Sequence, residues 1–234
     1  MKKMFLLANT LVAILLSCSK PNSGGVVVVT EPADEVLSLE ASARDNFQIY
    51  QVNPKLFGSS AQLKAVQNRL DDIKALGTDI LYLMPIYTEG SKNSVGSPYC
   101  IRDYKGVKAD CGSLSDVKAL VTAAHSKGMK VMFDWVANHT AWDHPWITDH
   151  ADWYQKDGNG NIVYPSKDGE WKDVAQLNYN STELQDAMID AMKYWITEAD
   201  IDGYRCDYAH GVPDSFWNLI TADPDDNKFV DCAF

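Results

Sequence analysis

The sequence predicts an α/β protein in which parallel strands alternate with helices. Short apolar runs rich in β-branched and aromatic residues alternate with segments whose apolar residues recur every three to four positions. Repetition of this kind gives a parallel sheet with right-handed crossovers. The 234-residue chain is 46% hydrophobic and 23% charged, as in an ordinary globular protein, and its net charge of −11 argues against a nucleic-acid partner, which needs a basic surface.

The first strand–helix–strand unit is expected over residues 47–84. Residues 47–52 (FQIYQV) predict the first strand, and residues 80–84 (ILYLM) predict the second. The second strand ends at Pro85, because proline has no N–H to donate to a ladder. One apolar helix face lies between the two strands and consists of Leu63, Val66, Leu70 and Ile73, followed by Gly77.

The next unit repeats this order. Apolar positions from Leu114 to Ala124 predict the second helix, and Gly128 is a plausible cap at its end. Residues 129–135 form a near-continuous apolar run, as expected for a parallel strand that is buried on both faces.

A third helix is predicted from Leu184 to Trp195, with Thr182 and Gln185 placed as a capping box. Residues 201–206 predict the fourth strand, and residues 212–213 open a fourth helix.

The positions of polar residues favour a (β/α) barrel over a doubly wound sheet. Asp134 ends the third strand and Asp207 ends the fourth. Functional polar residues at the carboxyl ends of successive strands are typical of the barrel. No glycine-rich turn follows the first strand, so the dinucleotide-binding fingerprint is missing.

Residues 138–180 interrupt the alternation and have no helical period. A segment of this length inside a compact domain is usually functional or a small inserted subdomain. His144 and His150 stand beside aspartates, but loop histidines without helical spacing are more often solvated than metal-bound. One or two of the tryptophans in the segment are expected to line a ligand cleft: Trp142, Trp146, Trp153 and Trp171.

Two motifs at the strand ends carry the chemistry, residues 134–139 (DWVANH) and 203–207 (GYRCD). Arg205 and Asp207 are two positions apart on a strand, so their side chains point to the same face. An arginine favours the ionised form of a neighbouring carboxylate and orients it. Such an aspartate is what a glycosidase needs as a nucleophile, although a structural ion pair would have the same spacing.

With residues 97–104 (SPYCIRDY), these motifs resemble the alpha-amylase family of glycoside hydrolases, family 13, over most of the chain from Phe47 to about Leu219. The resemblance implies an α/β fold, the N-terminal half of a (β/α)8 TIM barrel with a small insertion after the third strand. It also implies an alpha-1,4-glucan substrate, such as starch or maltooligosaccharides, and a retaining double-displacement mechanism.

The resemblance implies a role for each matched residue. Asp207 would be the catalytic nucleophile, Arg205 would hold it in place, and Asp134 would hydrogen-bond Arg205. His139 would contact the sugar ring that is cleaved, and Tyr99 would stack against that ring.

Calcium is a possible cofactor by the same resemblance, with Asn138 as a ligand. Gln176 stands where relatives often have a ligating aspartate, and a neutral amide oxygen is a poorer calcium ligand than a carboxylate. His210 stands where relatives often have a lysine for the leaving-group sugar. It would either serve there or cap the following helix.

The N-terminal residues predict export. Residues 1–17 have the charged start and apolar run of a signal peptide, and Cys18 follows a sequence that resembles a bacterial lipobox. Lipidation of Cys18 would anchor the protein to a membrane of the bacterial cell envelope, on the periplasmic or the outer side. Residues 18–45 would be a tether, residues 46–234 the partial catalytic barrel, and residues 140–180 its inserted subdomain.

Export permits disulfides. Cys100 and Cys111 are close enough in sequence to pair, but the sequence does not fix the connectivity, and simple buried or free thiols are expected ahead of a functional role.

The family's general acid is a glutamate after the fifth strand, and only four strands are counted before Phe234. We therefore expect a C-terminally truncated glucan hydrolase that is inactive as printed. Two alternatives stay open: a surface lipoprotein that binds starch without cleaving it, and an assembly of paired half-barrels.

Overall fold

A computed structural model describes residues 47–167 and 169–221. These residues all belong to one compact unit, residues 44–234. The predicted signal peptide, Cys18, the tether and the C-terminal tail lie outside the described residues.

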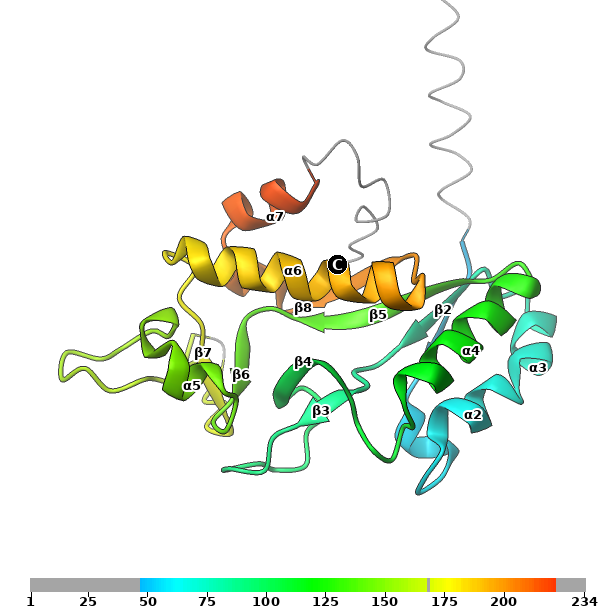
Figure 1. Cartoon of the computed structure of the whole chain (residues 1–234), viewed down its shortest axis with the longest axis horizontal. Helices are drawn as coiled ribbons and strands as arrows, with labels where there is room; N and C mark the ends of the chain where they lie inside the picture. Colours follow the sequence, from blue (N-terminus) through cyan, green and yellow to red (C-terminus); the bar gives the residue numbers. More distant parts are fainter. Residues whose placement is uncertain (1–46, 168, 222–234) are drawn as a thin grey trace, which may run out of the picture. The chain divides into compact units, whose positions relative to one another are not determined.

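A four-stranded parallel sheet forms the centre of the unit, in the order β1-β2-β5-β8. Its strands are β1 (Ile49–Val52), β2 (Ile80–Leu83), β5 (Lys130–Val136) and β8 (Gly203–Asp207). Helices connect successive strands and pack along the sheet (Figure 1). The predicted fold class is confirmed: the described residues form an α/β fold with a parallel sheet, consistent with the N-terminal part of a (β/α)8 barrel.

The helix predicted after β1 is split into two. α2 (Gln62–Gln67) and α3 (Leu70–Ala75) are separated by Asn68 and Arg69. The break is a tighter turn, because the Arg69 N–H donates to the Val66 carbonyl, three residues earlier, at 2.9 Å. The four predicted apolar residues remain buried across the break, so the packing face survives although the helix does not.

The later helices follow the predicted order. They are α4 (Leu114–Ser126), α6 (Thr182–Ala199) and α7 (Asp214–Thr221). The capping box predicted from Thr182 and Gln185 at the start of α6 does not form. Ser181 is the N-cap and its hydroxyl accepts from the Leu184 N–H at 3.2 Å, because the helix begins directly after it.

Two small antiparallel sheets sit at the carboxyl ends of the central strands. β3 (Tyr87–Glu89) pairs with β4 (Ile101–Val107), a hairpin that the sequence pattern did not predict. β6 (His139–Ala141) pairs with β7 (Val174–Gln176) and closes the base of the insertion. Between them lie α5 (Trp146–Asp149) and a 3₁₀ turn over Ala151–Trp153, while further 3₁₀ turns cover Pro54–Phe57 and Ala209–Gly211.

The two faces of the central sheet differ in chemistry. Alternate residues on the helix-covered face are apolar and belong to the main core: Leu81, Leu83, Val131, Phe133, Trp135, Tyr204 and Cys206. The opposite face, called here the inner face, has a separate apolar cluster of Ile80, Tyr82 and Met132. Since side chains alternate along a strand, Asp134, Arg205 and Asp207 project from this inner face.

Cys100 and Cys111 are free thiols in this structure. Cys100, Cys111 and Cys206 are all buried, so the possible pairing of Cys100 with Cys111 does not form. No helix among the described residues is long and apolar enough to cross a membrane.

Candidate active site

Strand register brings the two motifs together. β5 and β8 pair so that Asp134 lies opposite Arg205, and Val136 lies opposite Asp207. One guanidinium nitrogen, Arg205 Nη1, donates to Asp134 Oδ1 at 3.1 Å and to Asp207 Oδ1 at 2.7 Å. A single arginine thus links two carboxylates and fixes the position of the more exposed one, Asp207.

Asp134 is the buried end of this network. Its side chain has no solvent exposure, and its Oδ2 accepts hydrogen bonds from the Tyr82 hydroxyl and from the Tyr99 hydroxyl, the latter at 3.1 Å. Burial raises the pKa of Asp134, while the Tyr82 hydroxyl and Arg205 act in the opposite direction. Burial and the neighbouring carboxylate likewise raise the pKa values of Tyr82 and Tyr99, which keeps both phenols protonated as donors.

Asp207 opens into a cavity of about 310 Å³. Its side chain is 22% exposed, so a ligand in the cavity can reach the carboxylate. The cavity brings together residues from the loop between β3 and β4, from β6, from the insertion and from β8: Val95, Ser97, Tyr99, His139, Trp171, Asp173, Val174 and Asp207.

His139 is a neutral hydrogen-bonding group in this cavity. The residue is only 4% exposed, and burial lowers the pKa of its imidazole to about 4, against the raising effect of Asp207 and Asp173. The Asn138 amide nitrogen lies 3.2 Å from His139 Nδ1 and donates to it, so the ring proton is on Nε2. His139 therefore contributes an N–H donor and no charge near neutral pH.

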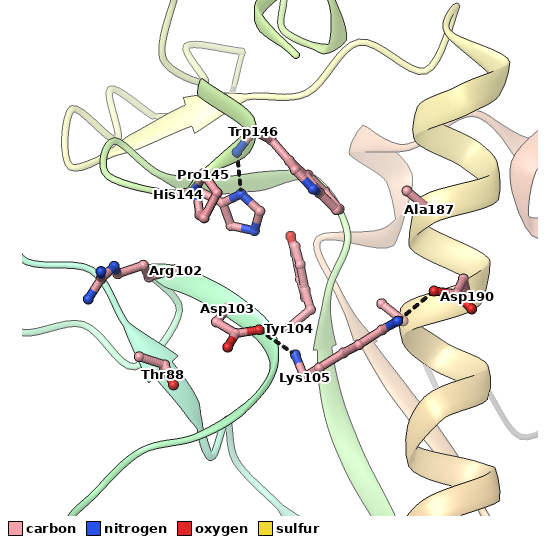
Figure 2. A pocket seen from close by; sticks show the side chains of 11 residues that line it. Thr88, Arg102, Asp103, Tyr104, Lys105, His144, Pro145, Trp146, Ala187 and Asp190 are labelled. Carbon is pink, nitrogen blue, oxygen red and sulfur yellow. Dashed lines mark hydrogen bonds and ion pairs between the residues drawn. The ribbon is translucent and has the colours of Figure 1, made fainter. Parts of the chain in front are cut away.

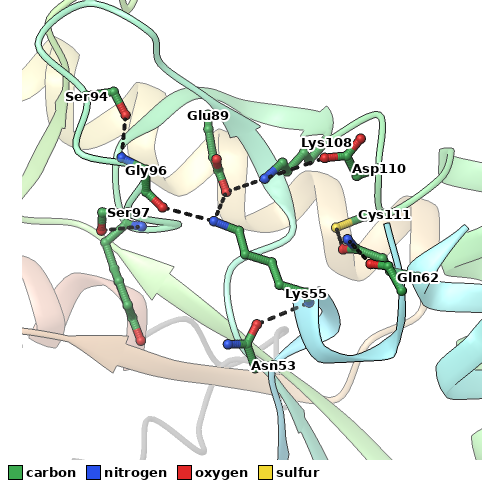
Figure 3. Close-up of polar contacts among 12 residues, drawn as sticks. Asn53, Lys55, Gln62, Glu89, Ser94, Gly96, Ser97, Lys108, Asp110 and Cys111 are labelled. Carbon is green, nitrogen blue, oxygen red and sulfur yellow. Dashed lines mark hydrogen bonds and ion pairs between the residues drawn. The ribbon is translucent and has the colours of Figure 1, made fainter. Parts of the chain in front are cut away.

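The loop that carries Tyr99 is held by a partly buried charge cluster (Figure 3). Lys55 Nζ donates to the Gly96 carbonyl at 3.0 Å and pairs with Glu89 at 3.2 Å. Lys108 Nζ reaches the same Glu89 oxygen at 2.9 Å. Ser97 Oγ then accepts from the Tyr99 N–H at 3.2 Å, which sets the direction of the tyrosine.

Trp171 is the tryptophan of the insertion that reaches the Asp207 cavity. Its ring contacts His139 at 5.7 Å and Tyr208 at 4.7 Å between centroids. By contrast, Trp153 is buried, and Trp142 Nε1 donates to the Lys172 carbonyl within the insertion. One of the four predicted tryptophans is therefore part of this cavity.

His210 lies on the other side of Asp207. A second cavity, of about 490 Å³, contains His210, Asp207, Arg205 and Trp171, and the His210 ring contacts Tyr208 at 4.1 Å between centroids. This placement is compatible with a ligand contact.

A match to the family model for the catalytic domain of alpha-amylase covers residues 38–230. The chain is 30% identical over 210 residues to the alpha-amylase MalA of Haloarcula japonica, an alignment that covers 85% of this chain and 30% of that protein. The chain belongs to the alpha-amylase family.

Two solved structures of family members resemble the fold. An alpha-amylase of Lactobacillus plantarum superposes with a TM-score of 0.68 at 42% identity, over 74% of this chain and 41% of that one. The maltogenic alpha-amylase AmyB of Thermotoga neapolitana gives 0.70 at 34% identity, over 76% and 43%. The chain thus spans less than half the length of these relatives.

The calcium site expected from the alpha-amylase family does not fit the atoms around Asn138. Gln176 Nε2 donates to the Asn138 carbonyl at 2.9 Å, to Asn138 Oδ1 at 3.0 Å and to the Leu177 carbonyl at 3.2 Å. These three oxygens are of the kind that calcium binds, and here the Gln176 amide N–H₂ donates to all of them. The Asn138 amide in turn donates to Gln176 Oε1 at 3.3 Å.

Gly211 is required beside this pair. A Cβ at that position would lie 2.6 Å from Asn138 Oδ1 and 2.2 Å from the Tyr208 ring. The turn after β8 is therefore packed directly against the base of the insertion.

The expectation that His144 and His150 are both solvated is wrong for His144, which is 4% exposed because the aromatic side chains of the insertion cover it. His150 is exposed and stacks on Trp153 at 3.9 Å between centroids. No group of three or more potential metal-ligating side chains occurs in residues 47–167 and 169–221.

Three residues of the site were not found from the sequence. Tyr82 was predicted only as part of a strand. Its position in the strand beside Asp134 could have indicated a hydrogen bond between the two side chains. Asp173 reaches the Asp207 cavity from the insertion, and Lys55 acts through the Tyr99 loop. Neither has a local pattern, because both depend on how distant loops meet.

Proposed function

We propose that the protein is a retaining glycoside hydrolase of alpha-1,4-glucans, with Asp207 as the nucleophile. The observation that carries the proposal is the bridge from Arg205 Nη1 to both Asp134 and Asp207 at the mouth of a cavity. The bridge holds the Asp207 carboxylate in one position facing the cavity, as a nucleophile requires.

The other residues of the cavity suit a sugar ring. Tyr99 and Trp171 offer aromatic surface for the apolar face of the ring. His139 contributes a neutral ring to the same cavity. In the proposed first step, Asp207 Oδ attacks the anomeric carbon as the bond to the leaving oxygen breaks, and Arg205 stays paired with Asp134 while the charge on Asp207 is consumed.

A retaining mechanism also requires a general acid about 5–5.5 Å from the nucleophile. None of the glutamates in the described part of the chain lines either cavity at Asp207. Asp173 is the other carboxylate in the smaller cavity. We therefore propose that these residues supply the nucleophile and the sugar contacts, and that a group outside them protonates the leaving oxygen.

The nucleophile can be tested without a general acid. In 5-fluoro-α-D-glucosyl fluoride, Asp207 Oδ forms a bond to C1 while the C1–F bond breaks, and fluoride leaves with the electron pair without needing a proton. Incubation of the full chain should add one fluoroglucosyl group, which tandem mass spectrometry places on Asp207. Asp207→Asn should remove the label, and the matched change Asp173→Asn should keep it. Labelling of Asp173, or no labelling of a folded chain, would contradict the proposal.

We further propose that the Gln176 amide replaces calcium in this chain.

The position of the protein in the cell rests on Cys18, and lipidation there would hold the catalytic unit at a membrane of the cell envelope. Loss of membrane fractionation in a Cys18→Ser variant would support this anchor. Unchanged fractionation would contradict it.

A further inference from the structure

A separate cavity of about 490 Å³ lies between β4, the start of α5 and α6 (Figure 2). None of its lining residues also lines either cavity at Asp207. The size is within the range of small-molecule sites, about 300–1,000 Å³.

His144 presents an unused donor to this cavity. The residue is 4% exposed, and its Nδ1 accepts from the Trp146 backbone N–H at 3.1 Å (Figure 2). The ring proton is therefore on Nε2. No acceptor for Nε2 occurs among the residues the structure describes, and the atom is not one of the fully buried polar atoms there, so a ligand or water in the cavity can accept this hydrogen bond. Burial also lowers the pKa of His144 to about 3, so the ring is neutral.

Trp146 supplies a rigid aromatic wall. Its ring is half-buried and lies 5.5 Å from Tyr104 and 5.1 Å from Trp153 between centroids. These contacts fix the indole before any ligand arrives, which lowers the ordering cost of binding. Within the described residues, the indole N–H has no hydrogen-bond acceptor.

The rim of the cavity is polar and balanced in charge. Lys105 pairs with Asp190 at 2.5 Å across the opening, and Arg102 and Asp103 add one further charge of each sign (Figure 2). In the part of the chain that is described, the Arg102 guanidinium has no ion pair or hydrogen bond, so its donors are available. A balanced rim favours neither a polyanion nor a polycation. Donors and carboxylate acceptors beside an aromatic wall suit a neutral, hydroxyl-rich ring.

We propose that this cavity is a second carbohydrate-binding site, which holds a segment of neutral alpha-glucan against Trp146, His144 and Arg102. The choice of glucan rests on the proposed function, whereas the site itself rests on the cavity and its unused donors. A remote site of this kind would keep a long glucan attached while another part of it occupies the Asp207 cavity, and it would raise the apparent affinity for long chains over short ones.

Titration calorimetry of the full chain with maltoheptaose and maltotriose tests the site. A Trp171→Ala background removes one of the two aromatic surfaces of the Asp207 cavity and so weakens binding there, and the Arg102-dependent part of the remaining binding reports on the second site. In that background, Arg102→Ala should weaken maltoheptaose binding about tenfold, the size expected for loss of a hydrogen bond from a charged donor. His144→Asn keeps an acceptor near the Trp146 N–H, removes Nε2–H, and should also weaken binding. Lys156→Ala, an exposed cation in neither site, is the matched control and should change nothing.

The outcomes separate the two proposals. If Trp171→Ala abolishes all maltoheptaose binding by a folded protein, the second site is wrong and the function of the Asp207 site stands. If Arg102→Ala has no effect beyond that of Lys156→Ala, the second site is also wrong. If Arg102-dependent binding persists but 5-fluoro-α-D-glucosyl fluoride does not label Asp207, the proposed function fails and the second site stands. If cellohexaose binds as tightly as maltoheptaose, the assignment to alpha-glucan is wrong.

Discussion

The two faces of the same strands have opposite roles. In β5, Phe133 and Trp135 are buried in the core under the helices, whereas Asp134, between them, projects from the inner face and pairs with Arg205. In β8, Cys206 packs in the core and its neighbour Asp207 faces a cavity. Because side chains alternate along a strand, neighbouring positions can differ completely in what a substitution does. Changes on the core face should affect stability, and changes on the inner face should affect chemistry.

The largest expected effect is on the inner face. Asp207→Asn should abolish fluoroglucosyl labelling and, in a catalytically complete protein, lower kcat by roughly 10⁴-fold or more, as for other covalent nucleophiles. The substitution keeps the size of the side chain, so the midpoint of urea unfolding should change little. A large loss of stability in Asp207→Asn would contradict the expectation that inner-face residues affect chemistry and core-face residues affect stability.

The next effect is on the core face. Phe133→Ala should lower the free energy of unfolding by about 3–5 kcal/mol, because the residue is 1% exposed and its removal leaves a cavity. Urea unfolding followed by circular dichroism measures it. At temperatures where the variant is still folded, labelling of Asp207 should persist. Selective loss of labelling with normal stability would show that the faces are coupled.

Acidification should test the buried histidines. The folded-state pKa values of His139 and His144 are lowered to about 4 and about 3, below the ordinary value of 6.5, so the unfolded chain binds protons first as pH falls. Their contribution to stability is complete above pH 6.5 and is lost as pH falls from 6.5 toward 4, by about 1–3 kcal/mol per histidine. Unfolding curves between pH 7 and pH 4 measure this loss. His139→Gln should make the free energy of unfolding less dependent on pH in this range. An unchanged dependence would contradict the lowered pKa of His139.

The smallest effect concerns the base of the insertion. Gln176→Asp removes three hydrogen bonds and places a carboxylate beside acceptor oxygens, so stability should fall by about 1–2 kcal/mol in EDTA. Calcium should restore it, because the new carboxylate adds a hard ligand to the oxygens already present. Thermal unfolding with EDTA or calcium measures both states. The original protein and the control Gln67→Asp, a change in α2 away from Asn138, should be insensitive to calcium. A lower melting temperature of the original protein in EDTA would contradict replacement of the ion by Gln176.

The parts of the site that could be predicted from the sequence are those on regular strands. Arg205 and Asp207 share a face by their spacing, and Asp134 lies near the end of the neighbouring strand β5. Parallel pairing of the two strands therefore brings the three side chains together. Loop residues were less predictable. His144 has no periodic pattern to mark it as buried, and the β3–β4 hairpin has register shifts that interrupt strict alternation.

The sequence by itself determined the fold class, the strand–helix order and the two motifs, because hydrophobic periodicity and strand alternation are local properties of the chain. The tertiary structure alone decided which distant side chains meet. It brought Tyr82 onto Asp134, placed the Gln176 amide among the oxygens of Asn138 and Leu177, and left a donor of His144 facing a second cavity. Such contacts depend on register and on loop packing between segments far apart in sequence, and no local pattern records them.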